Sequence, residues 1–173
     1  MKVRGQLLKT GLLLSATLLF FASAIAEETA LSVGDTAPDV LGKNRKGDEI
    51  KVSDNLGKIV VANFWDTKCK KCSSQLQLLE NLQQMAGKKL IEVVSILYKQ
   101  KRHVFVTAVK SFGDIQMTMA VDARGHAGKA YGVDKLPHMV IINKEGKVAY
   151  IHAGHDKKIA SKLENEINTL LAQ

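Results

Sequence analysis

The chain has 173 residues, of which 46% are hydrophobic, and a formal net charge of +8. This length suits one domain with a workable hydrophobic core. The basic residues are not interleaved with aromatic ones, so we expect no nucleic-acid partner and interpret the charge as a basic face toward an acidic partner or a membrane surface.

The first 26 residues have the pattern of a secretory signal peptide. Basic residues within 1–9 precede an almost wholly apolar stretch over 12–26, which ends in an Ala-x-Ala sequence. The apolar stretch is shorter than the roughly 20 residues of a membrane span. We therefore predict a cleaved leader over 1–26, a domain over 27–173 and a periplasmic location. A membrane anchor formed by an uncleaved leader is the alternative.

Beyond the leader, strands alternate with helices. We predict a β-hairpin over 40–52 and a buried strand over 58–65. The next helix has apolar residues at helical spacing, from Leu76 to Met85, and is predicted to end just before Gly87. A second strand over 90–97 is hydrophobic enough to be covered on both faces.

The second half of the chain continues this alternation. Asp156 is predicted to cap a last helix, whose apolar residues recur at i, i+4. Strands and helices in this order indicate an α/β fold with a mixed central sheet flanked by helices. The other elements are predicted as a helix over 103–112, a strand over 115–121, a short helix over 125–131, and a hairpin of strands over 138–143 and 148–152.

The only two cysteines, Cys69 and Cys72, are predicted to lie where the strand over 58–65 meets the following helix. A helix beginning near Cys69 would give this sulfur unpaired backbone N–H groups and the positive end of the helix dipole, which stabilise a thiolate. Cys72, one turn on, would lie on the same helix face and be more buried. We interpret the pair as a redox-active dithiol with an exposed nucleophile and a sheltered resolving thiol.

Other chemistry is open to the same cysteines. A zinc site needs two further ligands, and no second cysteine pair supplies them. A structural disulfide across so short a loop would constrain the unfolded chain little. In a copper-handling metallochaperone, His138 would join Cys69 and Cys72, although His138 could instead donate a proton or face the other side of its strand. A thiol peroxidase reacting through Cys69 is a third hypothesis.

The sequence Asn63-Phe64-Trp65, followed by Cys69-x-x-Cys72, resembles the thioredoxin superfamily. Within it, the chain is similar to the TlpA/ResA type of extracytoplasmic thiol–disulfide oxidoreductase, which includes reductases of cytochrome c maturation. The further stretches that match are Val33–Asp39, Gly57-Lys58, Tyr131–Val133, Leu136–Ile142 and Asn143–Lys147.

The resemblance implies a thioredoxin fold with an N-terminal β-hairpin extension, and an enzyme that needs no cofactor and no metal. Its disulfide between Cys69 and Cys72 would exchange with protein thiols. Pro137 would be a cis-proline that, with Leu136 and Trp65, holds the substrate. The expected partners are exported proteins bearing thiols or disulfides and a membrane donor of thiol reductant.

The sequence departs from the family pattern around the dithiol. Lys68 stands where tryptophan is usual, and Lys71 where proline is usual between the cysteines. Gln75 and Asn63 replace acidic residues of relatives. Positive charge beside Cys69 favours its thiolate and therefore the reduced form, which makes the disulfide a stronger oxidant.

Overall fold

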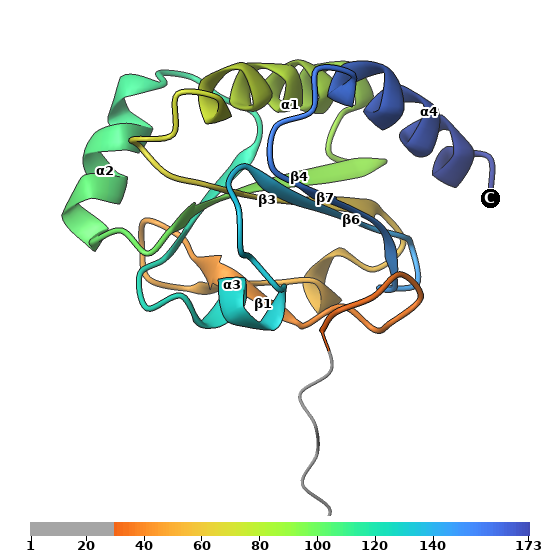
Figure 1. Ribbon diagram of the computed structural model, residues 1–173, viewed down its shortest axis with the longest axis horizontal. Helices are drawn as coiled ribbons and strands as arrows, with labels where there is room; N and C mark the ends of the chain where they lie inside the picture. The colour runs from red at the N-terminus through yellow and green to blue at the C-terminus, as the bar shows by residue number, and fades with distance from the viewer. Residues whose placement is uncertain (1–29) are drawn as a thin grey trace, which may run out of the picture.

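The computed structural model describes residues 30–173, which form one seven-stranded sheet with helices on both faces (Figure 1). The leader predicted over 1–26 lies outside the described residues. The elements in chain order are β1 (Val40–Lys43), β2 (Glu49–Lys51), the 3-10 helix η1 (Ser53–Asn55), β3 (Ile59–Trp65), α1 (Cys72–Ala86), β4 (Ile91–Tyr98), α2 (Arg102–Ser111), β5 (Thr118–Asp122), α3 (His126–Ala130), β6 (His138–Ile142), β7 (Val148–Ala153) and α4 (Ile159–Leu171).

The sheet is mixed, with the strand order β2-β1-β5-β4-β3-β6-β7. Strands β3, β4 and β5 pair in parallel, whereas β6 and β7 continue the sheet antiparallel to β3. Every residue of β3 is buried, as is every residue of β4 before Tyr98. The α/β architecture predicted from the sequence is therefore confirmed, including two central strands that are covered on both faces.

The predicted N-terminal hairpin is present and extends this same sheet. Strands β1 and β2 pair antiparallel, and β1 joins the rest of the sheet where Lys43 pairs with Val121 of β5. Gly42 has a φ of 138°, and a Cβ there would lie 3.0 Å from the Val121 carbonyl oxygen. A side chain at this position is therefore excluded both by the backbone conformation and by the close approach of β5.

Two hydrophobic cores lie on opposite faces of the sheet. Along β3, Val61 and Trp65 pack into the core beneath α1, α2 and α4, whereas Phe64 packs into the core on the α3 side. Successive side chains of a strand point to opposite faces, so the strands β3, β4, β5 and β6 contribute to both cores. The dithiol belongs to the first of these cores, because Cys72 is buried in it.

Helix α1 is fastened to the sheet by a side chain that the periodicity of the sequence does not single out. Gln83 is 1% exposed; its Nε2 donates to the Ile91 carbonyl at 3.0 Å, and its Oε1 accepts from the Val93 N–H at 2.7 Å. Strand β5 pairs with β4 only from Val94 onward. The Gln83 amide thus supplies the hydrogen bonds that a neighbouring strand would make before β5 begins.

The structure corrects three predicted element boundaries. Helix α1 begins at Cys72 rather than near Cys69, and β5 begins at Thr118 rather than at residue 115. Asp156 does not cap α4, which begins at Ile159; its Oδ1 accepts the Lys158 N–H at 2.8 Å in the preceding turn. Met85 follows the helical spacing but is 82% exposed.

The predicted end of α1 is confirmed, since Gly87 follows it with a φ of 70°. Within residues 30–173, no helix combines the length and the hydrophobicity that crossing a bilayer requires.

Candidate active site

Cys69 and Cys72 form a disulfide, with their Cα atoms 5.3 Å apart. The loop from β3 closes in a turn in which the Cys72 N–H donates to the Cys69 carbonyl at 3.0 Å. Cys69 is half-buried in this loop, whereas Cys72 is the first helical residue and is 1% exposed. The difference in burial agrees with the prediction of an accessible and a sheltered sulfur, although Cys69 precedes the helix.

The turn that carries Cys69 is held by Asp66, a residue that the sequence analysis did not identify. One carboxylate oxygen of Asp66 accepts the Lys68 N–H at 2.6 Å, and the other accepts the Gln100 Nε2 at 2.5 Å. An aspartate that bonds a backbone N–H two residues on is a common turn signal, so the first of these bonds was accessible from the sequence. The second joins residues that are 34 positions apart.

The three lysines around the dithiol, Lys68, Lys70 and Lys71, are all exposed. Their charges act on Cys69 through water, where they are weakened by the high dielectric constant and by salt. Stabilisation of the Cys69 thiolate by the lysines therefore stays a prediction, and added salt should weaken it.

Two buried amides lie beneath the start of α1, at the positions where the resemblance implies acidic residues. Gln75 Nε2 donates to Asn63 Oδ1 at 2.8 Å, and the two residues are 6% and 0% exposed. Ser95 is 0% exposed and pairs with Asn63 in the β3–β4 register. This hydrogen bond satisfies one donor of Gln75 and the side-chain oxygen of Asn63. None of the three side chains is an acid or a base, so the cluster cannot exchange protons with the dithiol.

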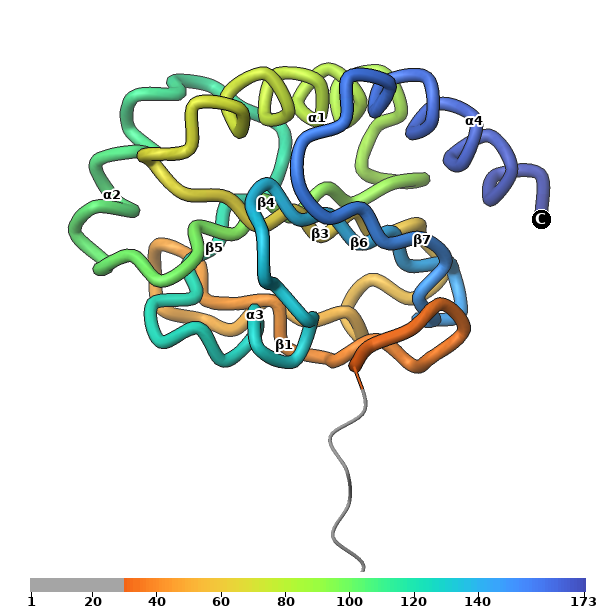
Figure 2. Tube along the Cα trace, viewed as in Figure 1, coloured from red at the N-terminus to blue at the C-terminus, as the bar shows by residue number. Residues whose placement is uncertain are grey.

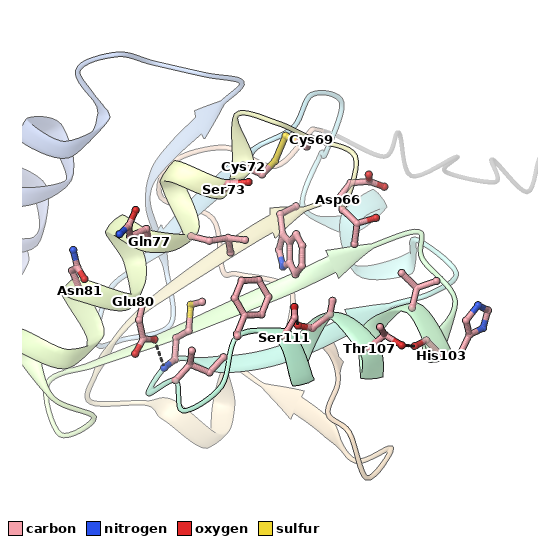
Figure 3. A pocket seen from close by; sticks show the side chains of 18 residues that line it. Asp66, Cys69, Cys72, Ser73, Gln77, Glu80, Asn81, His103, Thr107 and Ser111 are labelled. Carbon is pink, nitrogen blue, oxygen red and sulfur yellow. Dashed lines mark hydrogen bonds between the residues drawn. A yellow bond between two sulfur atoms is a disulfide. The ribbon is translucent and has the colours of Figure 1, made fainter.

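Trp65 and both cysteines line a groove of about 770 Å³ between α1 and α2, and the disulfide lies at one end of it (Figure 3). The indole is 4% exposed and packs edge to face on Phe112, with ring centroids 5.8 Å apart. Trp65 is thus a packed aromatic side chain in the same core as Cys72. We name this feature, lined by residues of α1, α2 and the segments flanking them, the α1/α2 groove.

The end of the α1/α2 groove away from the disulfide is held by Glu80 of α1. This residue was not predicted from the sequence. Its carboxylate accepts the Gln116 N–H at 2.8 Å and the Met117 N–H at 3.0 Å. Burial raises the pKa of Glu80, but these N–H donors, together with Gln84 and Lys88, outweigh burial and hold the pKa below its usual value. Because the bonded partners lie 36 and 37 residues away, no local pattern could have revealed them.

The Leu136–Pro137 peptide bond is cis, in agreement with the resemblance. Pro137 is buried and immediately precedes β6, and Leu136 is half-buried. The pairing of Phe64 with His138 brings the start of β6 beside the end of β3. The cis-proline therefore lies beside the strand from which the loop to the cysteines departs.

His138 is turned away from the dithiol. Its ring packs edge to face on Phe64, with centroids 6.2 Å apart, and Phe64 belongs to the α3-side core. Burial lowers the pKa of His138, while Asp134 and the backbone of Tyr131 oppose this shift. Residues 30–173 contain no group of three side chains placed to hold a metal ion. The structure thus does not bring together the copper ligands Cys69, Cys72 and His138.

Comparisons with known proteins agree with this site. A family model described as Redoxin matches residues 32–169. The thiol-disulfide oxidoreductase ResA of Geobacillus thermodenitrificans is 32% identical over 134 residues, which cover 78% of this chain and 76% of the relative. ResA of Bacillus subtilis is 27% identical over 157 residues, covering 88% of this chain and 87% of the relative.

A solved structure shares the fold over most of its length. A Chlorobium tepidum protein assigned as thiol:disulfide interchange protein DsbE superposes with a TM-score of 0.73 and 28% identity, covering 82% of this chain and 99% of that one. The thioredoxin fold predicted by resemblance is thereby confirmed. The chain belongs to the Redoxin family and is a thiol–disulfide oxidoreductase of the thioredoxin superfamily.

Proposed function

We propose that the protein works in an exported compartment, with Cys69 as the attacking thiolate and Cys72 as the resolving thiol. The observation that carries this assignment is the disulfide between a half-buried Cys69 and a Cys72 that is 1% exposed. Only the sulfur that a partner can approach can form the mixed disulfide, and the sheltered sulfur is placed to displace the partner afterwards.

The exchange needs no external cofactor. In the reducing direction, the Cys69 thiolate attacks one sulfur of a partner disulfide, and the other partner sulfur leaves as a thiolate. The Cys72 thiolate then attacks Cys69 Sγ and releases the partner's second thiolate, so that two electrons pass to the partner and the Cys69–Cys72 disulfide forms. The oxidising direction is the reverse of these two steps.

The proposed substrate-holding residues are Trp65, Leu136 and Pro137. Trp65 packs beside the cysteines, and the segment of Leu136 and Pro137 lies beside the end of β3. Proline has no backbone N–H, so a bound peptide would pair with the neighbouring backbone groups.

The export and partner assignments rest on the leader-like sequence and on the family resemblance. We propose a leader over 1–26, a domain over 27–173, a periplasmic location, exported thiol proteins as substrates and a membrane protein as the donor of reductant. A compartment that oxidises thiols makes such a donor necessary if the dithiol is to act as a reductase. Reduction of an apocytochrome disulfide to its two thiols during cytochrome c maturation is the specific role that we propose.

The redox assignment is tested by equilibrating the protein with glutathione buffers and counting the free thiols by alkylation and mass spectrometry. We expect a single two-electron transition between disulfide and dithiol. A disulfide that resists an excess of dithiothreitol under native conditions would instead indicate a structural bridge.

The maturation role has its own test in cells that lack the protein. We expect less haem-bearing cytochrome c in these cells, restored by the wild-type chain but not by Cys69→Ser. An unchanged cytochrome level would overturn the maturation role and leave the oxidoreductase assignment intact.

A further inference from the structure

The α1/α2 groove continues from the disulfide along the face of α1 that is turned toward α2 (Figure 3). On α1 it extends from Cys72 to Asn81, which at ~1.5 Å per residue is roughly 13 Å. Its apolar lining consists of Trp65, Leu76, Val104, Ala108, Phe112, Ile115 and Met117. Polar side chains along its edges are Ser73, Gln77 and Asn81 of α1 and His103, Thr107 and Ser111 of α2.

The two carboxylates that line the α1/α2 groove are both engaged within the protein. Asp66 binds the Lys68 N–H and Gln100, and Glu80 binds the N–H groups of Gln116 and Met117. Neither carboxylate is therefore free to recognise a cationic ligand. What the groove offers a partner is apolar surface with a hydroxyl- and amide-bearing rim, which is the composition of a site for an apolar side chain.

The reaction itself determines which molecule lies over this groove. A partner sulfur must reach Cys69, and Cys69 lines one end of the groove. An extended chain advances ~3.3 Å per residue, so a segment of about four residues beside the reacting cysteine spans the groove from Cys72 to Asn81. Three exposed lysines, Lys68, Lys70 and Lys71, lie around Cys69, at the end of the groove where the substrate cysteine reacts.

We propose that the α1/α2 groove binds a large apolar side chain of the substrate polypeptide, about two to four residues from the cysteine that reacts with Cys69, with acidic residues preferred beside that cysteine. The occupant is thus a locally extended segment of a thiol- or disulfide-bearing protein. This inference rests on the proposed exchange at Cys69 and adds a preference for substrate sequence that is separate from the cis-proline side of the site.

The test uses reduced protein and two synthetic peptides, each supplied as its symmetric disulfide dimer. Both peptides carry one cysteine flanked by glutamate, and they differ only in a leucine or a serine three residues from the cysteine. The reduced protein converts each dimer to two peptide thiols and becomes the disulfide itself. Trp65 is the only tryptophan and lies beside the cysteines, so its fluorescence follows the reaction; glutathione disulfide gives the reference rate of each variant.

With the wild type, we expect the leucine peptide to react about tenfold faster than the serine peptide at concentrations below saturation, which is the usual discrimination of an apolar pocket. Ser111→Phe and Thr107→Phe fill the groove from exposed positions of α2 and should remove most of this advantage. Lys110→Phe is the matched control, because Lys110 is exposed on the same helix and does not line the groove. It should retain the leucine preference.

Equal rates for the two peptides with the wild type would overturn the proposal, as would a leucine preference that survives both groove-filling variants or is lost equally in Lys110→Phe. These results would leave the exchange at Cys69 standing, since both peptides and glutathione disulfide would still be reduced. If the wild type reduces none of the three disulfides, the proposed function fails and the groove inference fails with it.

Discussion

Helix α1 lies between two apolar grooves of similar size that differ in what they adjoin. The α1/α2 groove, of about 770 Å³, ends at the disulfide. A second groove of about 670 Å³, the α1/α4 groove, lies between α1 and α4. Figure 2 shows α2 and α4 on either side of α1. The apolar lining of the α1/α4 groove consists of Leu78, Leu82, Met85, Ala86, Ile91, Ala160, Leu163, Ile167 and Leu171.

Size and hydrophobicity therefore do not distinguish the two grooves, but chemistry does. The α1/α2 groove contains both cysteines and is closed by the Glu80 hydrogen bonds to Gln116 and Met117. The α1/α4 groove is lined by neither cysteine nor histidine. Only the α1/α2 groove has a reactive sulfur at its end, so we assign substrate binding to it and not to the α1/α4 groove.

The largest expected effect is the loss of disulfide reduction when Cys69 is replaced. Cys69→Ser should abolish reduction of glutathione disulfide, because the remaining Cys72 sulfur is 1% exposed and has no partner thiol in the chain. Met85→Gln, on the exposed edge of the α1/α4 groove, should leave the rate unchanged. The measurement is the initial rate of glutathione release from the reduced proteins. A loss of rate in Met85→Gln comparable to that in Cys69→Ser would break the distinction between the grooves.

A substitution of Gln83 tests how α1, the helix that lines both grooves, is held on the sheet. Gln83→Leu leaves the Ile91 carbonyl and the Val93 N–H without their side-chain partner. Each unsatisfied buried group costs about 1–3 kcal/mol, so we expect the free energy of unfolding to fall by about 2–6 kcal/mol. Urea denaturation measures this change. Gln84→Leu is the control, because it removes only an exposed hydrogen bond to Glu80 and leaves no buried group unpaired. An equal loss there would contradict the role of the Gln83 amide.

A substitution of Glu80 affects the α1/α2 groove and not the α1/α4 groove. Glu80→Gln replaces one acceptor oxygen by a donor that faces a backbone N–H, so we expect a loss of about 1–2 kcal/mol at pH 7. The pKa of Glu80 is lowered in the folded state, so its stabilisation is present above the unfolded value of about 4.3 and is lost as the pH falls through the folded pKa. Denaturation at several pH values should show the wild type and the variant converging in acid. A difference that is independent of pH would contradict the charge-assisted bonds.

His138, on the face away from both grooves, should have the smallest effect. Burial lowers the pKa of His138 in the folded state, so the unfolded chain binds its proton first as the pH falls below about 6.5. The wild type should therefore lose stability between pH 7 and pH 5.5 relative to His138→Phe. His155→Phe removes an exposed imidazole as the control, and it should not reproduce the difference. The same slope in wild type and His138→Phe would exclude this histidine as its source.

Local sequence patterns determine much of this molecule in advance. The alternation along β3, with Trp65 on one face and Phe64 on the other, follows from the period of a strand, and Gly87 marks the end of α1. The Cys-x-x-Cys spacing at a strand-to-helix junction identifies the dithiol, because few other sites need that arrangement. The copper hypothesis depended instead on the direction of His138, which the strand period alone left open.

The features that could not be predicted from the sequence depend on contacts that form only when the chain folds. Glu80 binds backbone groups that lie 36 and 37 residues away. The Gln83 amide completes the ladder of β4 with partners 8 and 10 residues away, across the turn that follows α1. The start of α1 at Cys72 depends on a turn that Asp66 and Gln100 hold together. The groove beside the disulfide arises because α2 packs at a distance from α1 that no periodicity specifies.

The central claim is the division of labour between the two cysteines, and trapping of mixed disulfides tests it most directly. Cys72→Ser and Cys69→Ser, each with the full chain, are expressed in a host that exports the protein, and adducts are resolved by nonreducing electrophoresis and mass spectrometry. Cys72→Ser should accumulate reducible adducts on Cys69, because no other thiol in the chain can displace the partner. Cys69→Ser should accumulate few, since the Cys72 sulfur is buried. Equal adducts through either cysteine would contradict the account.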